Sequence, residues 1–289
     1  MDITEPGTID DLVRDADQAG HLVTSRLITD WVAKGLLDRP DRRPRGRGKG
    51  SAKALYTPEQ RKLFLTLLGK RSEGAHQIDR LARVPIFLWL YAEQGMERVP
   101  TRQVVRALHT WLRDCTTNKD RAAELAKKIM HLLDHPQACP GDKRRLKHML
   151  VEINLTGKVA DRAGLERAAR DVFEPATVFG PIVRVEGHPA TMLTVDGFMG
   201  LVDARLVASA AIRAERVTEA ELEVARREYQ STRADYRNRL PEFHHHAPEH
   251  LKDIFAPSTS QDLFDTCGLD LMTLLGCLRQ HAARRHPAS

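Results

Sequence analysis

A strongly basic segment near the N-terminus limits how this chain can fold. Between Arg39 and Lys53 the sequence reads RPDRRPRGRGKGSAK, which holds seven basic residues and one acidic residue, Asp41. The segment's net charge of +6 equals the formal net charge of the whole chain. It contains no aliphatic side chain larger than alanine, and its charges repel one another, so it cannot build a hydrophobic core. We therefore expect the basic segment (residues 39–53) to stay solvated or to lie against an anion.

Patterns typical of short helices lie on both sides of the basic segment. Before it, residues 8–18 and 24–34 carry apolar side chains at helical spacing, and a glycine follows each stretch. Thr24 or Ser25 can cap the second helix. After the segment, Thr57-Pro58-Glu59-Gln60 combines a threonine N-cap, a proline at the first helical position and a glutamine at N3. The first two helices and their turn predict a helix-turn-helix arrangement, with Trp31 in the core.

The rest of the chain also carries mainly helical patterns. β-branched residues with glycine and proline at residues 177–195 predict one short β-hairpin. The predicted fold class is mainly α, with a winged helix-turn-helix domain at residues 1–95 and a helical C-terminal domain at residues 96–289. Further helical patterns occur at residues 75–90, where Pro85 should end or kink the helix, and at 101–115, 120–170, 217–240 and 269–278.

Composition and cysteine usage predict a cytoplasmic protein. Hydrophobic residues make up 42% of the 289 residues, which is enough for a core, and no apolar run approaches the roughly 18 to 20 residues of a membrane span. The acidic, polar N-terminus does not resemble a signal peptide, and none of the four cysteines forms a C-x-x-C pair. We expect reduced thiols, with Cys267 and Cys277 buried and inert among leucines.

The spacing of several residues around the basic segment adds a second pattern. Val23 lies at the predicted turn, and the triplet Gly35-Leu36-Leu37 begins twelve residues later. Trp31 precedes the triplet, and Tyr56 follows the basic segment. This order resembles the DNA-binding domain of the MerR (mercury-resistance) regulator family, in which an arginine-rich wing closes on a tyrosine.

The resemblance covers roughly residues 5–90 and implies a winged helix-turn-helix domain that binds duplex DNA. The sequence departs from the family pattern at Thr29, where the family carries an arginine, and its basic segment is longer than the usual wing. The C-terminal part of the chain resembles no family that we recognise.

The predicted second helix carries groups suited to contacting DNA. Hydroxyls, backbone N–H groups and a guanidinium at its N-terminus are the groups that reach base edges in the major groove. The basic segment would lie along phosphates or reach the minor groove, where it supplies affinity rather than sequence reading. The predicted DNA-binding residues are Thr24, Ser25, Arg26, Thr29, Arg42, Arg43, Arg45, Arg47, Lys49, Lys53 and Tyr56.

These features favour a sequence-specific, double-stranded DNA-binding protein, most simply a homodimeric bacterial transcriptional regulator associated with the nucleoid. Two alternatives remain. One is an accessory factor that handles mobile-element or plasmid DNA during excision, partition or replication. The other is an interaction module that binds RNA or a protein through the basic segment, which taken by itself could also be a solvated linker.

The C-terminal region is expected to dimerise or to respond to an unknown effector or partner. Within residues 217–240 a heptad-like spacing suggests a seam for a second copy; the alternative is that this helix docks on its own domain. The seam residues are Leu222, Ala225, Tyr229, Thr232 and Tyr236.

The sequence gives no sign of catalysis. His244, His245, His246 and His250 could in principle hold a metal, but Pro241 and Pro248 bracket most of them, which favours a solvated polar loop. Neither a nucleophile-elbow motif nor a phosphate-loop spacing occurs. We therefore expect no enzyme, no catalytic residue, no metal and no cofactor.

Overall fold

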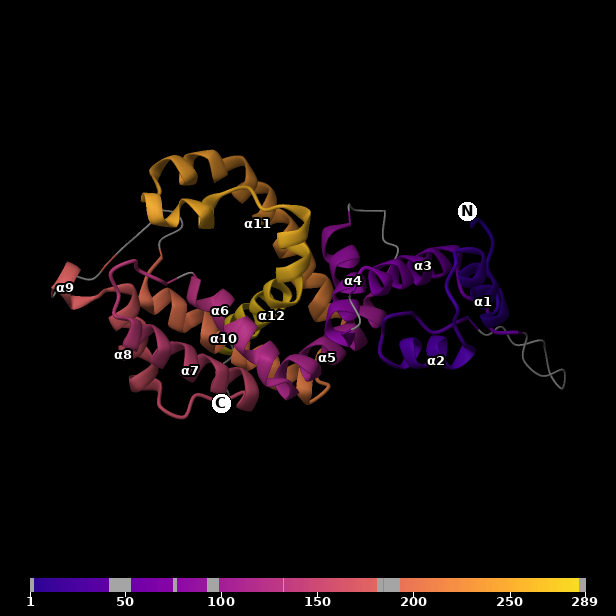
Figure 1. Cartoon of the computed structure of the whole chain (residues 1–289), viewed down its shortest axis with the longest axis horizontal. Helices are drawn as coiled ribbons and strands as arrows, with labels where there is room; N and C mark the ends of the chain where they lie inside the picture. The colour runs from indigo at the N-terminus through magenta and orange to yellow at the C-terminus, as the bar shows by residue number, and fades with distance from the viewer. Residues whose placement is uncertain are drawn as a thin grey trace. The chain divides into compact units, whose positions relative to one another are not determined.

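The computed structural model describes residues 3–41, 53–74, 77–92, 99–131, 133–180, 184 and 193–285. Within them the chain is mainly α-helical, as expected (Figure 1). The N-terminal helices are α1 (Ile9–Gln18), α2 (Ser25–Ala33), α3 (Pro58–Ser72), α4 (Ile78–Tyr91) and α5 (Thr101–Thr117). They are followed by α6 (Lys119–His131), α7 (Pro140–Thr156), α8 (Arg162–Phe173), α9 (Ala176–Phe179), α10 (Val195–Arg213), α11 (Glu219–His246), the 3₁₀ helix η1 (Glu249–Phe255) and α12 (Ser260–Arg285).

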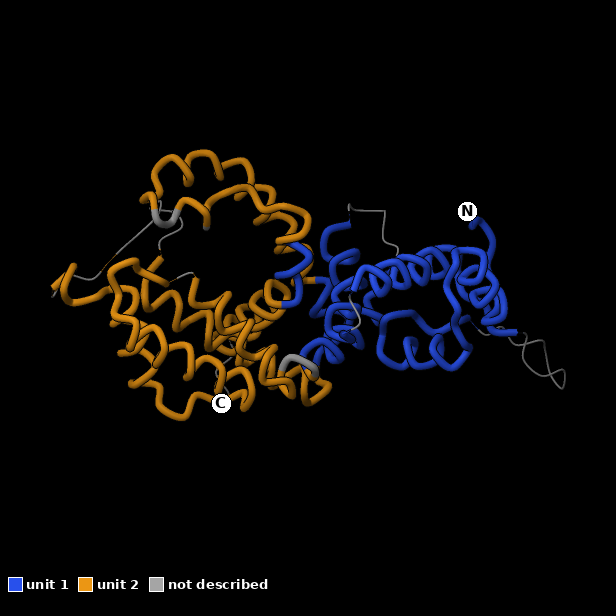
Figure 2. Tube along the Cα trace, viewed as in Figure 1, with its two compact units in different colours: residues 1–112, 217–223, 263–268 blue, residues 113–216, 224–262, 269–289 orange. Residues whose placement is uncertain are grey.

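The chain divides into two compact units (Figure 2). The division falls within α5, α11 and α12, so each of these helices has residues in both units. The first stretch of unit 1 ends at Leu112, whereas the sequence predicts a domain boundary at residue 95. Unit 1 comprises residues 1–112, 217–223 and 263–268, and unit 2 comprises residues 113–216, 224–262 and 269–289.

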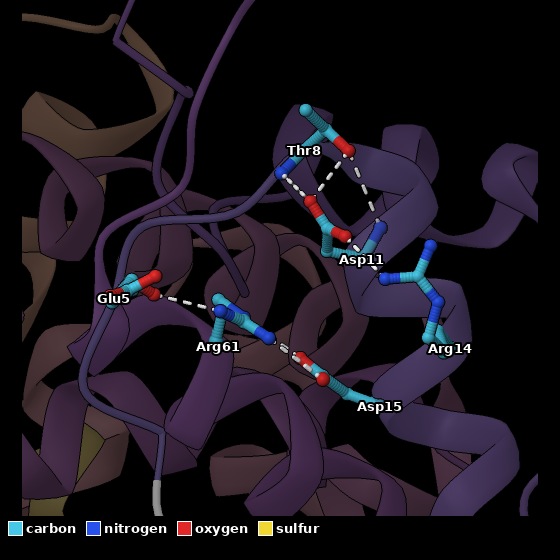
Figure 3. Close-up of polar contacts among 6 residues, drawn as sticks. All are labelled: Glu5, Thr8, Asp11, Arg14, Asp15 and Arg61. Carbon is cyan, nitrogen blue, oxygen red and sulfur yellow. Dashed lines mark hydrogen bonds and ion pairs between the residues drawn. The ribbon is translucent and has the colours of Figure 1, made fainter.

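Hydrogen bonds at the start of α1 explain why the helix begins there. The backbone N–H of Thr8 donates to the Asp11 carboxylate at 2.7 Å, and the Thr8 hydroxyl accepts from the Asp11 N–H (Figure 3). This reciprocal capping box satisfies donors that the first helical turn leaves free. The side chain of Arg61, on α3, donates two hydrogen bonds to Asp15 and thereby joins α3 to α1.

The core of unit 1 forms where α1, α2 and α3 meet. Leu12, Ile28 and Phe64 are fully buried. Trp31 is 2% exposed and packs edge-on against Phe64, with ring centroids 5.6 Å apart, which confirms its predicted core position. Such an aromatic pair stabilises packing beyond the area that it buries.

Unit 2 contains a helical core of its own. Helix α7 packs against α6 and α8, and α8 packs against α10. Leu146, Leu165, Phe173 and Phe198 are among the buried residues of this cluster. Helix α12 approaches α10 so closely that a Cβ atom on Gly276 would overlap the Ala204 carbonyl group. Among the described residues, no helix combines the length and the apolar character needed to cross a lipid bilayer.

Several local predictions for unit 2 were wrong. The proposed β-hairpin begins with Thr177–Phe179, which instead belong to the short helix α9; most of its remaining residues lie outside the described part of the chain. Helix α11 continues through Pro241, so His244–His246 are helical rather than in a loop, although they are solvated as expected. Cys267 is buried as predicted, but Cys277 is exposed.

Candidate nucleic-acid interface

The turn between α1 and α2 is held at both of its ends. After α1, Gly20 adopts a φ of 80°, and the N–H of His21 donates to the carbonyl of Ala16 at 2.8 Å. These features form the glycine-ended helix stop expected from the sequence. At the other end, the hydroxyl of Thr24 accepts from the N–H of Leu27 and caps α2. The position of the α2 N-terminus is therefore defined by hydrogen bonds on either side of the turn.

The predicted base-reading residues lie together on the exposed N-terminal part of α2. Thr24, Ser25, Arg26 and Thr29 are all exposed. The Thr29 hydroxyl donates to the Ser25 carbonyl at 3.0 Å, so its oxygen is left to accept. The guanidinium of Arg26 forms no hydrogen bond or ion pair with any residue that the structure describes. Arg26 is therefore the strongest donor on this surface that is available to a ligand.

Two antiparallel backbone pairs hold the base of the basic segment. Asp41 and Leu55 exchange hydrogen bonds of 2.8 and 3.0 Å, and Gly7 and Tyr56 exchange bonds of 3.0 and 2.7 Å. Residues 55–56 are thus paired on one side to the start of the basic segment and on the other to Gly7, in the stretch before α1. Lys53 is exposed beside this ladder. The predicted contacts Arg42, Arg43, Arg45, Arg47 and Lys49 lie outside the described residues.

Tyr56 does not present its ring to solvent. The residue is only 5% exposed, and burial raises the pKa of its phenol. Its backbone pairing with Gly7 and its buried ring give Tyr56 a structural position at the base of the basic segment. A buried ring is poorly placed for the DNA contact that the sequence predicted for Tyr56.

A hollow of about 770 Å³ lies between the start of α1 (Thr8, Ile9 and Asp10), α2 and the base of the basic segment. Thr29 and Val32 line it from α2, and Arg39 and Lys53 line it from the two ends of the segment. Tyr56 contributes to its wall. The structure therefore brings the predicted residues Thr29, Lys53 and Tyr56 around one concave surface.

A network of buried polar groups fixes the chain between α2 and the basic segment. The backbone N–H of Asp38 donates to the Gln60 side chain at 2.8 Å. Gln60 in turn donates to Gln103 at 2.9 Å, and Gln103 donates to the Leu36 carbonyl at 2.7 Å. The sequence predicts that Gln60 completes the capping box of α3. In the structure only the Thr57 hydroxyl caps this helix. Its side chain instead joins α3 and α5 to the Gly35–Asp38 stretch.

Two arginines of α5 complete the attachment at Asp38. Arg102 donates to the Asp38 carboxylate at 2.8 Å, and Arg106 donates at 3.0 Å. Burial alone would raise the pKa of Asp38, but these hydrogen bonds, together with one from the Arg39 N–H, hold it below its ordinary value. The basic segment therefore begins directly after a carboxylate that is fixed to α5.

Gly35 allows α5 to approach this closely. It adopts a φ of 73°, and a Cβ atom there would lie 2.5 Å from the backbone nitrogen of Ala107 and from the Cβ of Arg106. The glycine was expected to end α2, which it does. Sequence reasoning did not foresee its second role, because the contact joins residues far apart in the chain.

The described residues suggest no metal site, and comparisons with known proteins identify no relative of the chain. Within the described residues, no group of three or more His, Cys, Asp or Glu side chains is arranged to hold a metal ion. No protein-family model, no curated protein and no solved structure matches the chain.

Proposed function

We propose that unit 1 binds double-stranded DNA as a winged helix-turn-helix domain. Helices α1 and α2 form the helix-turn-helix, and the basic segment forms the wing. The observation that carries the proposal is the hollow to which α2 and both ends of the basic segment contribute walls, together with the start of α1. A recognition helix and a wing that contact one duplex must lie next to each other in this way.

The charges favour different roles for the basic segment and for α2. The basic segment, with a net charge of +6, would contact phosphates and provide sequence-independent affinity. The exposed N-terminal residues of α2 would enter the major groove, where Arg26 can donate two hydrogen bonds to a guanine. The hydrogen bonds around Asp38 would hold the first residues of the wing at a fixed position relative to α2.

The salt dependence of binding tests the proposed wing. If the basic segment contacts about five phosphates per subunit, the logarithm of the association constant should fall by roughly four to five units per unit of log salt. Fluorescence anisotropy with a labelled duplex measures this slope. Arg45→Gln with Arg47→Gln should reduce its magnitude by roughly two.

The control removes the same charge elsewhere. Arg144 and Lys147 are exposed on α7 in unit 2, so Arg144→Gln with Lys147→Gln should leave the slope unchanged. A flat salt response of the unaltered protein would rule out the wing. Tighter binding to an RNA of matched length and sequence would favour the RNA-binding alternative instead.

Arg26 tests the assignment of the recognition helix. Arg26→Ala should cost about 1–3 kcal/mol on the preferred duplex and relax its base preference, because a bidentate base contact is lost. Arg45→Ala should instead weaken binding to all duplexes about equally, because a phosphate contact carries no sequence information. Sequencing of genomic fragments retained by each variant measures the preference. If Arg26→Ala changes neither affinity nor preference, α2 is not the recognition helix.

A regulator that reads a palindromic site needs two copies of the chain. We propose a homodimer, but not one built on the whole heptad-like seam of α11. Leu222 and Ala225 of that seam are fully buried within the single chain, and Thr232 is exposed. The pairing surface would therefore lie elsewhere.

A further inference from the structure

Leu22 is an exposed leucine in the turn of the proposed helix-turn-helix. Its relative exposure is 95%, the highest among the large hydrophobic side chains of the described residues. The other exposed large hydrophobic side chains, including Leu55 and Val207 at 38%, are far less exposed. Leu22 stands two positions before Thr24, the N-cap of α2.

The backbone on both sides keeps Leu22 in place. Gly20 and His21 donate to carbonyls of α1 at 2.9 and 2.8 Å, and the His21 ring lies 3.4 Å from the Ser72 hydroxyl of α3. On the other side Thr24 caps α2. A leucine with almost complete exposure adds nothing to the core, and the hydrogen bonds of its neighbours fix the place of its backbone in the turn.

We propose that Leu22 contacts the 5-methyl group of a thymine in the major groove and so selects thymine at one position of the DNA site. This inference rests on the proposed function. The N-terminal end of the second helix of a helix-turn-helix faces base edges, which places the adjoining turn near the same groove. The thymine methyl is the apolar group that base pairs present there. A leucine can neither donate to a base nor attract a phosphate, so this methyl group is the chemistry that matches it.

Replacing thymine by uracil removes this methyl group and leaves the base pairing intact. In the preferred duplex, each thymine is replaced in turn by deoxyuridine, and the affinity of the full-length protein is measured for each duplex. We expect one replacement to weaken binding by about fourfold, the value of one buried methyl group. Leu22→Ala should weaken binding to the thymine duplex and abolish the difference between the thymine and uracil duplexes at that position.

Two controls separate this effect from folding and from surface hydrophobicity in general. Leu22→Ala should leave the thermal unfolding temperature unchanged, because the side chain is almost fully exposed. Val207→Ala, on α10 in unit 2, removes another exposed aliphatic side chain and should change neither affinity nor the response to uracil.

The outcomes distinguish the two proposals. If the unaltered protein does not bind duplex DNA, the proposed function fails. If it binds with the expected salt slope but Leu22→Ala keeps the full discrimination between thymine and uracil, the contact at Leu22 is overturned while DNA binding stands. Equal weakening of Leu22→Ala on both duplexes, with the discrimination intact, would also overturn it, because Leu22 would then contact the duplex without distinguishing the methyl group.

Discussion

Gly35→Ala should lower the free energy of unfolding by about 2–5 kcal/mol. A positive φ costs a residue with a side chain about 1–2 kcal/mol, and forcing a methyl group into a filled space costs about 1–3 kcal/mol more. Both penalties apply, because Gly35 has a φ of 73° and its Cβ would lie 2.5 Å from the Ala107 nitrogen. The backbone of α5 would have to move away, and Asp38 would lose its fixed position.

Gly20→Ala is the matched control for this prediction. Gly20 has a similar φ of 80°, but a Cβ atom there would meet nothing within 4 Å. It should therefore cost only the conformational part, about 1–2 kcal/mol. Urea unfolding curves measure both variants, and the difference between them reports the crowding against α5. Equal losses for the two variants would contradict the close packing of α5 on Gly35.

Asp15→Ala should lower the free energy of unfolding by about 3–5 kcal/mol, because it leaves a nearly buried arginine without its carboxylate. The Asp15 and Arg61 side chains are 7% and 14% exposed, and two hydrogen bonds of 2.8 Å join them (Figure 3). Arg61 also donates to the Glu5 carbonyl at 2.7 Å. Loss of Asp15 would therefore loosen α1 and the residues before it together.

Arg14→Ala removes a neighbouring ion pair that is far more exposed. The Arg14 and Asp11 side chains are 65% and 30% exposed, so this pair should contribute only about 0–1 kcal/mol. The double substitution Asp15→Leu with Arg61→Met should recover much of the loss, because apolar side chains of similar size leave no buried charge unpaired. Urea unfolding again provides the measurement. A loss for Asp15→Ala no larger than that for Arg14→Ala would show that the Asp15–Arg61 pair is dispensable.

The features predicted correctly from the sequence are those set by neighbouring residues. Thr8, Thr24 and Thr57 cap the helices that follow them, and Gly20 and Gly35 end the helices before them. These signals act over three to five residues, so the sequence displays them directly. The order of helices around the basic segment follows from the same local rules.

The features that were missed depend on residues far apart in the chain. The Asp38–Arg102 pair and the Gln60–Gln103 hydrogen bond join positions 64 and 43 residues apart, and no local sequence pattern predicts them.

Helix α10 was missed for another reason. Its buried residues include neighbours such as Phe198 with Met199, and Ala208 with Ser209, so the helix lacks one clear apolar stripe.

Pro241 caused an error of the opposite kind, because a local sequence signal predicted a helix end that the structure does not have. Pro241 removes a backbone donor and usually ends a helix. Helix α11 nevertheless continues to His246, beside a small cluster in which Phe243 and Phe255 are buried. The packing of these two rings supplies tertiary contacts, which the helix propensity of the local sequence does not take into account.

The paired backbone at the base of the basic segment has an evolutionary consequence. The backbone pair between Asp41 and Leu55 joins the two ends of the segment, and Gly7 pairs with Tyr56. The helices are therefore held by contacts that lie outside residues 42–54. Lengthening the connection between two fixed points of a chain costs little, about 0.6 kcal/mol for each doubling of its length. Insertions and deletions between residues 41 and 55 could therefore accumulate among descendants of this protein without disturbing α2 or α3. The length of the segment can therefore change independently of α2.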